Sequence, residues 1–199
     1  MPKTLITVGP GDHGRRMSLE HFDQAEGQEG YRYELGRGVI AVVEVPDPRH
    51  FAQVDAISLQ LADYRLAHPG QIHRLGGGGD CKILLADLAT ERHPDVAIYK
   101  TAPPEGDNPW ARWVPEIVLE VVSPTSAHRD YEEKPDEYLH FGVRDYWILD
   151  AERQEMLVLR RRGRRWTRRI VRPPDVYHTP LLPGLEFACG PVFEAAQGR

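Results

Sequence analysis

Two acidic residues interrupt apolar runs in the middle of the chain. Asp95 opens the run 95–99, and Glu120 lies inside the run 116–122. A charge in a β-rich core is costly unless it is paired or bound to a cation, and Mg²⁺ prefers carboxylate oxygens as ligands. The two residues therefore predict a hard-metal site on neighbouring strands. The alternative is that Asp95 only starts its strand and that Glu120 faces solvent.

Length and composition indicate a globular protein. The chain has 199 residues, of which 41% are hydrophobic and 28% charged, enough for a core without disulfides. Cys81 and Cys189 lie far apart and outside any C-x-x-C pair, so we expect them in the core. No apolar stretch approaches the length of a membrane span or resembles a secretory signal, which predicts a cytoplasmic protein without membrane contact.

The charges are divided unevenly along the chain. Residues 1–150 hold 15 Lys and Arg against 25 Asp and Glu, whereas residues 151–199 hold 10 against 5. The basic excess is concentrated at 160–169, where Arg160, Arg161, Arg164 and Arg165 could bind the phosphates of a nucleic acid. The alternative is an exposed hairpin that its charge keeps in solution.

Hydrophobic periodicity predicts the elements of the first half. We expect residues 1–16 to form a flexible lead-in and residues 17–199 to form a single domain. A short helix at 19–25, capped by Ser18, should precede a hairpin of 31–35 and 39–45. A helix at 49–67 should follow. Its buried stripe should comprise Phe51, Val54, Ile57, Leu61 and Tyr64.

The second half reads as strands followed by a helix, a strand and a hairpin. Strands are predicted at 81–86, 95–99, 116–122 and 145–150, and a C-terminal hairpin at 156–159 and 166–171, before a loop-rich tail. A helix should run from a cap at Thr125 or Ser126 to Gly142, with Pro135 kinking it or delaying its start. The glycine run 76–79 lacks the ending of a phosphate loop and reads as a flexible hairpin connection. This order predicts an α/β (α+β) fold, a mixed sheet flanked by helices.

An ordered set of motifs resembles a known family. From about 17 to 193, the chain is similar to the Uma family of restriction endonucleases within the PD-(D/E)xK nuclease superfamily. The motifs that carry the resemblance are Tyr33-Glu34-Leu35, Pro48-Arg49-His50, Pro94-Asp95, Glu120-Val121-Val122-Ser123-Pro124, Arg129-Asp130, Glu133-Lys134, Tyr138, Gly142-Val143, Tyr146-Trp147-Ile148-Leu149-Asp150 and Leu182-Pro183-Gly184.

The resemblance implies a restriction-endonuclease-like αβββαβ core with N-terminal and C-terminal hairpins. Its three consecutive strands would be those at 81–86, 95–99 and 116–122. Asp95 and Glu120 would be ligands of Mg²⁺ or Mn²⁺. The lysine expected two positions after the glutamate is Val122 here, and Lys134 from the following helix would replace it. The alternative is a solvated Lys134 that pairs with Asp130 or Glu133 on its own helix. Glu34 would be a further metal or water contact, unless it is an exposed strand residue.

The function expected from this reading is Mg²⁺-dependent hydrolysis of phosphodiester bonds in nucleic acid, with DNA as the favoured substrate. A homodimer would supply two sites for a duplex. The rival is a catalytically silent dimeric module that binds nucleic acid or protein on the same fold. The sequence leaves two alternative roles for each of two further residues. Ser123 either caps the next helix or contacts substrate. His50 is either a structural residue, at a helix start or packed in the core, or a catalytic base.

Overall fold

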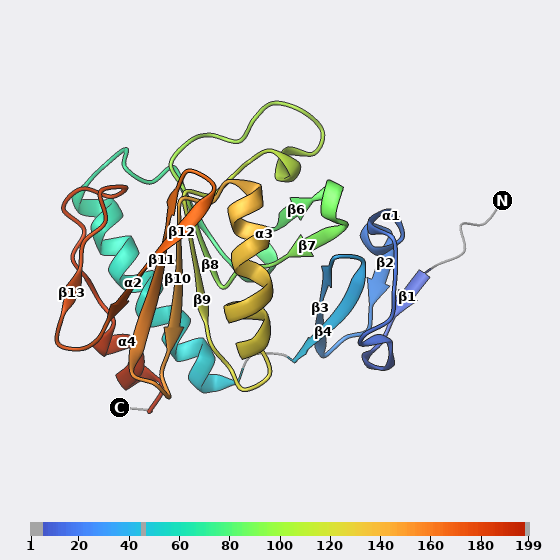
Figure 1. Ribbon diagram of the computed structural model, residues 1–199, viewed down its shortest axis with the longest axis horizontal. Coiled ribbons are helices and arrows are strands. Elements are labelled where there is room, and N and C mark those ends of the chain that lie inside the picture. Colours follow the sequence, from blue (N-terminus) through green and yellow to red (C-terminus); the bar gives the residue numbers. More distant parts are fainter. Residues whose placement is uncertain (1–5, 45–46, 198–199) are drawn as a thin grey trace.

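The computed structural model describes residues 6–44 and 47–197. Its two main sheets are a six-stranded sheet from the middle and C-terminal parts of the chain, and a four-stranded sheet that contains β3 and β4 of the N-terminal part (Figure 1). The helices α2 and α3 cover opposite faces of the larger sheet (Figure 1). The fold is therefore a mixed α/β architecture, as predicted.

The larger sheet has the strand order β12-β11-β10-β9-β8-β5. In chain order its strands are β5 (Arg74–Gly76), β8 (Val96–Tyr99), β9 (Ile117–Val121), β10 (Asp145–Asp150), β11 (Glu155–Arg162) and β12 (Arg165–Val171). β9 and β10 are parallel, and the other neighbours are antiparallel. A parallel pair needs a crossover connection, and α3 (Lys134–Phe141) lies in that connection.

Alternate residues of the central strands face opposite helices. Leu119 belongs to the core cluster that contains Ile57 of α2 (Pro48–Ala67), whereas Val118 packs in the cluster that contains Tyr138 of α3. Strands that are buried on both faces read as continuous apolar runs, which is why β8, β9 and β10 could be predicted. Glu120, two residues after Val118, projects toward the α3 face.

The helix predicted at 49–67 is confirmed as α2. Its start is well defined because the Asp47 side chain accepts a hydrogen bond of 2.8 Å from the His50 N–H, and Pro48 occupies the first helical turn. The predicted buried stripe is wrong at Phe51, which is 63% exposed, while Gln53 is buried. Gln53 lies one helical turn before Ile57 and shares its face, whereas a six-residue step turns Phe51 away from it.

The strand predicted at 81–86 is shorter and lies in another sheet. It forms β6 (Ile83–Leu85), which pairs with β7 (Thr90–Arg92). With β3 (Tyr31–Gly36) and β4 (Val39–Glu44), these strands make the four-stranded sheet of order β4-β3-β7-β6. The αβββαβ order of the core is present, but its first strand is β5. That strand has three residues and ends in glycine, so no apolar run marks it.

The N-terminal segment contains secondary structure that was not predicted. Within the lead-in expected at 1–16, residues 6–16 include a strand and a short 3-10 helix, and residues 1–5 lie outside the described residues. β1 (Ile6–Val8) pairs with β2 (Ala25–Gly27), and Arg16 forms a bridge to Val39. The helix expected at 19–25 is α1 (Leu19–Asp23), with Ser18 as its cap. It ends early because Ala25 enters β2.

The C-terminal hairpin is confirmed as β11 and β12, but the tail after it contains structure that was not predicted. A short sheet joins β13 (Val176–Tyr177) and β14 (Phe187–Ala188), and α4 (Gly190–Ala195) contributes Phe193 to the same core cluster as α2. Cys81 and Cys189 are buried free thiols, as expected. Within the described ranges, no helix has both the length and the apolar character needed to cross a bilayer.

Candidate active site

Asp95 and Glu120 lie opposite each other at the ends of two antiparallel strands. The register pairs Val96 of β8 with Leu119 of β9, and one further step brings Asp95 level with Glu120. Residues that are directly opposite in an antiparallel pair project from the same face. The Asp95 N–H lies 3.4 Å from Glu120 Oε2, and the Val121 N–H donates to Asp95 Oδ2 at 2.8 Å. The sheet register therefore brings the two predicted carboxylates together.

The glycine run 76–79 supports the start of β8. The Gly78 N–H donates to the Pro94 carbonyl at 2.8 Å. A Cβ at Gly77 would overlap the Asp95 carbonyl oxygen, whereas a Cβ at Gly79 would meet nothing within 4 Å. Gly77 is thus required by a close backbone approach. The run is not the hairpin connection that we expected, because β5 and β6 belong to different sheets.

The Lys134 ammonium lies between two carboxylates. Its Nζ is 3.0 Å from Glu120 Oε1 and 2.8 Å from Asp130 Oδ1, and the Tyr138 hydroxyl donates to the same Glu120 oxygen at 2.6 Å. The contact with Asp130 is an ion pair that is not aligned as a hydrogen bond. Burial by itself would lower the pKa of Lys134, but Asp130 and Glu120 outweigh it and raise the pKa. Lys134 therefore stays charged inside the protein.

A π-helical turn at Arg129–Glu133 precedes Lys134. The Lys134 N–H donates to the Arg129 carbonyl, five residues back, and Pro135 has no N–H with which to continue the α-helical pattern. The predicted effect of Pro135 thus takes the form of a widened turn. Upstream, the Ser123 side chain accepts a hydrogen bond of 3.2 Å from the Ser126 N–H, so Ser123 fills the capping role that we had assigned to Thr125 or Ser126.

Asp95, Glu120 and Lys134 line a cavity of about 680 Å³. The exposed fractions of their side chains are 11%, 3% and 5%. Glu34 and His50 line the same cavity. The charged groups therefore lie at the bottom of a recess, where they interact more strongly than charges on the surface.

Carboxylates outnumber cations at the bottom of this cavity. Burial, together with the charges of Asp95 and Asp130, raises the pKa of Glu120 to about 8, although Lys134 acts in the opposite direction. Burial would also raise the pKa of Asp95, but His50 and Lys134 outweigh it and lower the pKa. Asp95 is therefore ionised, whereas burial and the neighbouring carboxylates outweigh the one ammonium beside Glu120.

His50 links the start of α2 to this cluster. Its Nε2 lies 3.1 Å from Asp95 Oδ1, and its backbone N–H is the group that Asp47 caps. Burial lowers the pKa of His50, but the hydrogen bond with Asp95 and the charge of Asp95 outweigh it and raise the pKa. The residue thus lies in the first turn of a helix, and its ring contacts a candidate metal ligand.

The donor set at Asp95 and Glu120 suits a divalent cation. A cation there would offset the excess of carboxylate charge that raises the pKa of Glu120. In the part of the chain that the structure describes, no three His, Cys, Asp or Glu side chains form a metal-binding group. Mg²⁺ commonly uses only one or two carboxylates together with waters and substrate phosphate. The residues therefore fit Mg²⁺ or Mn²⁺ better than a structural zinc site.

Glu34 faces the same cavity but is held by another cation. Arg92, which is 0% exposed, donates to Glu34 Oε2 at 3.2 Å and to Glu137 at 2.8 and 3.0 Å. The His93 N–H donates to Glu34 Oε1 at 3.1 Å. Burial would raise the pKa of Glu34, but Lys134 and Arg92 bring it down to about 2. The alternative of an exposed strand residue is wrong, because Glu34 is buried.

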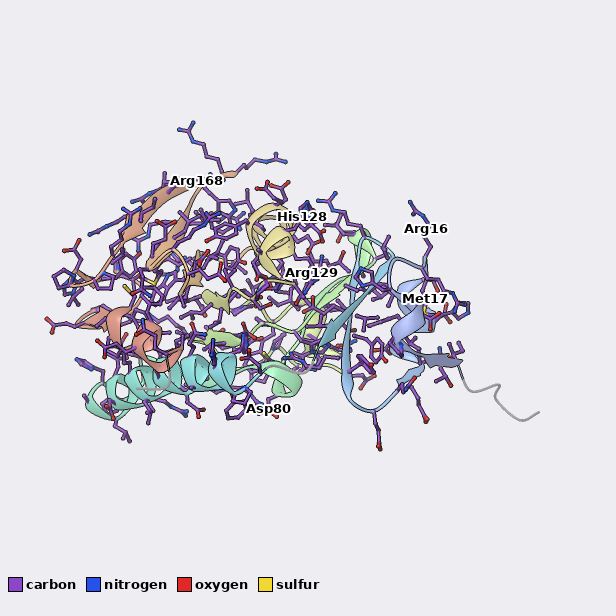
Figure 2. All side chains as sticks on the ribbon, turned by 90° about the horizontal axis from the view of Figure 1, so that it is seen from below. Arg16, Met17, Asp80, His128, Arg129 and Arg168 are labelled. Carbon is purple, nitrogen blue, oxygen red and sulfur yellow. The ribbon has the colours of Figure 1, made fainter. Side chains whose placement is uncertain are left out.

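The arginine-rich hairpin lies apart from the cavity lining. Arg160 donates to both carboxylate oxygens of Asp145, at 3.0 and 2.8 Å, and also to Tyr177 and Thr179. Arg161 donates to the Gly163 carbonyl, and Arg164 and Arg165 are exposed. None of these four arginines is among the residues that line the cavity. In Figure 2, Arg168 on β12 lies at the outer edge of the molecule, and Arg129 near its middle.

Sequence reasoning did not place three contributors in this buried charged region. Arg92 was not singled out because its partners Glu34 and Glu137 are distant in the sequence and no local pattern joins them. Tyr138 was noted only as part of a motif. Asp130 lies four residues before Lys134, a spacing that predicts an ion pair on a helix. That pair exists, but it is buried, and the same ammonium also reaches Glu120.

Comparisons with known proteins agree with this architecture. A family model described as "Putative restriction endonuclease", named Uma2, matches residues 19–190. A crystal structure of "a putative nuclease belonging to DUF820" from Anabaena variabilis ATCC 29413 is similar, with a TM-score of 0.71 and 17% sequence identity over 90% of this chain and 99% of that one. No curated protein matches the chain. The fold is restriction-endonuclease-like, and the chain belongs to the Uma2 family.

Proposed function

We propose that this protein is a Mg²⁺-dependent endonuclease that hydrolyses phosphodiester bonds of DNA. One observation carries the proposal: Asp95 and Glu120 lie side by side in a cavity, with the Lys134 ammonium 3.0 Å from Glu120. Two carboxylates and a cation are the groups that metal-assisted phosphodiester hydrolysis needs. The family description and the nuclease-like fold support the same reaction class.

Each of these residues has a separate role in the proposed reaction, which follows from its surroundings. Asp95 and Glu120 would hold the metal ion, which when bound polarises the scissile phosphate and lowers the pKa of a water molecule. Lys134 is charged and fixed, so it would stabilise negative charge that develops on the phosphate. His50 orients Asp95 through its hydrogen bond, and Lys134 and Arg92 together keep Glu34 ionised at the cavity wall.

A cleavage assay with closed circular DNA tests the proposal, because a circle has no ends for an exonuclease. We expect nicking or linearisation with Mg²⁺ or Mn²⁺ and none with EDTA. Asp95→Asn should lower the rate by about 10³-fold or more. Asp87→Asn is the matched control, since Asp87 is exposed and, among the described residues, its ion pair is with the exposed His140. Absence of cleavage of any nucleic acid with either metal would favour the catalytically silent binding module.

A homodimer is proposed separately. Cleavage of both strands of a duplex requires two active sites, and pairing of identical chains supplies them. Light scattering should then give about twice the chain mass of 22.6 kDa. A particle of 22.6 kDa at all tested concentrations would rule out the homodimer. The proposed reaction would still stand, because Asp95, Glu120 and Lys134 come from one chain.

A further inference from the structure

Arginines converge on the cavity from four separate elements. Arg32 lies on β3, Arg49 on the first turn of α2, Arg129 at the π-helical turn and Arg153 between β10 and β11, and all four line the cavity. The carboxylates Asp95 and Glu120 lie deeper, with 11% and 3% of their side chains exposed. The cavity therefore combines buried carboxylates with several arginines around them.

Most of these arginines are available to an anion. Among the side chains that the structure describes, none of the three residues Arg32, Arg49 and Arg129 forms an ion pair with a carboxylate. Arg32 donates only a long hydrogen bond of 3.4 Å to the His93 carbonyl, and Arg129 donates one of 3.1 Å to the Thr125 carbonyl. The Nε of Arg129 is buried without a partner.

The paired cations nearby provide a contrast. Lys134 lies close to two carboxylates, and Arg92 to three. A buried donor without a partner costs free energy, so a ligand that accepts a hydrogen bond from Arg129 Nε would lower this cost. Guanidinium groups match phosphate oxygens in charge and geometry. Phosphate is therefore the anion that this part of the cavity best accommodates.

We infer that the cavity binds one unpaired strand of nucleic acid, and that Arg32, Arg49 and Arg129 hold the phosphates that flank the scissile bond. This inference rests on the proposed function and specifies its substrate and contacts. Arg153 contributes less, because Asp150 lies 3.4 Å from it and the side chain is 62% exposed. The arginine-rich hairpin is not required for this binding.

The depth of the reactive groups favours a single strand. A phosphate must enter the cavity to approach Asp95, Glu120 and Lys134, none of which has more than 11% of its side chain exposed. A space of about 680 Å³ is of the size that holds small ligands, so it admits a few nucleotides of one strand, and a duplex must open locally before its phosphates can enter. Enzymes that do chemistry on a base likewise act on single strands or extrude the nucleotide from the duplex into a pocket.

Binding measurements with paired variants test the inference. The probe is a fluorescently labelled oligonucleotide, single-stranded or annealed to its complement, with Ca²⁺ in place of Mg²⁺ and with probe integrity checked on a gel. The cavity variant is Arg49→Ala/Arg129→Gln, and the matched hairpin variant is Arg164→Ala/Arg168→Gln, whose targets are exposed and outside the cavity lining. Circular dichroism melting shows whether each variant is folded.

We expect the cavity variant to bind the single strand at least about tenfold more weakly, and the hairpin variant to change binding by less than about twofold. The slope of log affinity against log salt should fall by about 0.7 for each phosphate contact removed. The duplex should bind at least about tenfold more weakly than the single strand. If the cavity variant does not fold, Arg32→Gln and Arg49→Ala are measured singly and should each weaken binding.

Two results would overturn the inference. One is equal or tighter binding of the duplex, and the other is a loss in the hairpin variant as large as that in the cavity variant. In either case, wild-type cleavage in Mg²⁺ would leave the proposed nuclease function standing. Strand binding that depends on the cavity arginines, without any cleavage, would instead support the inference and remove the nuclease function.

Discussion

The cavity and the arginine-rich hairpin carry charge in different ways. The hairpin concentrates its arginines in one stretch, at 160–169, and most of them face water, where ion pairs contribute only about 0–1 kcal/mol. The cavity draws Glu34, Asp95, Glu120 and Lys134 from separate parts of the chain and buries them, so that the Lys134 charge acts on the pKa of all three carboxylates. Charges that are few but buried therefore dominate the proposed chemistry, although the hairpin is more conspicuous in the sequence.

Among changes that leave both candidate metal ligands in place, removal of the buried ammonium should have the largest effect. Lys134→Ala should lower the cleavage rate by about 10²-fold or more, as for loss of one preorganised electrostatic group. It should also lower the free energy of unfolding by about 3–5 kcal/mol, because Glu120 and Asp130 are left buried without their partner. Cleavage rate and denaturant unfolding measure the two effects.

A second variant separates chemistry from folding at this position. Lys134→Ala/Asp130→Asn leaves one fewer unpaired carboxylate, so it should recover part of the lost stability without recovering cleavage. Cleavage by Lys134→Ala at the wild-type rate would mean that the lysine is only a structural partner of Asp130.

Two neighbouring glycines provide a test of backbone geometry. In Gly77→Ala the new Cβ overlaps the Asp95 carbonyl, so the start of β8 must shift and Asp95 with it. We expect Mn²⁺ affinity and cleavage to fall by about tenfold or more, since a displacement of about 1 Å can cost 10²-fold in rate. Gly79→Ala, with open space around it, should behave as wild type in both calorimetry and cleavage. Equal behaviour of the two variants would contradict this role for Gly77.

The stability of the metal-free protein should fall as the pH rises from about 4.5 to 8. The pKa of Glu120 is raised from 4.5 to about 8, so the folded state binds more protons than the unfolded state between these values. The raised pKa of His50 acts in the same direction above pH 6.5. Melting temperatures at pH 6 and pH 8 measure this difference.

Substitution and metal addition identify the source of that pH dependence. Glu120→Gln should flatten it, because the side chain no longer titrates. Mg²⁺ should raise the melting temperature more at pH 8 than at pH 6, since only the ionised carboxylate binds metal. The same pH dependence in Glu120→Gln as in wild type would assign it to other groups.

The smallest effect is expected at the hairpin. Arg164→Ala/Arg165→Ala removes two exposed charges that contact nothing in the cavity, and surface substitutions of this kind usually change stability by less than about 0.5 kcal/mol. Cleavage of a short single strand should stay within about twofold of wild type. A loss comparable to that of a cavity arginine would reverse the contrast between the two regions.

The elements that carry the site were predictable because burial on both faces leaves a simple pattern. β8, β9 and β10 are continuous apolar runs, and α2 repeats apolar residues at helical spacing. These strands carry or border Asp95 and Glu120, so their proximity could be expected. The first core strand was assigned to the wrong segment because β5 is short and contains no comparable run.

The remaining contacts join residues that are far apart in the sequence, and no local sequence pattern indicates such contacts. Arg92 is fully buried because Glu34 and Glu137 approach it from distant segments, and a sequence offers no sign of such a partner. Gly77 looked like a flexible linker residue because the close approach of Asp95 is a tertiary contact. Phe51 matches the helical spacing only approximately, and the buried face of the helix includes Gln53 instead.

The central claim is that Asp95 and Glu120 together bind a divalent cation. A crystal soaked in Mn²⁺ and measured for anomalous scattering tests it without relying on activity. The account predicts one anomalous peak within about 2.5 Å of a carboxylate oxygen of each residue, and its loss in crystals of Asp95→Asn. The absence of a peak between the two carboxylates in crystals that bind Mn²⁺ elsewhere would contradict the claim.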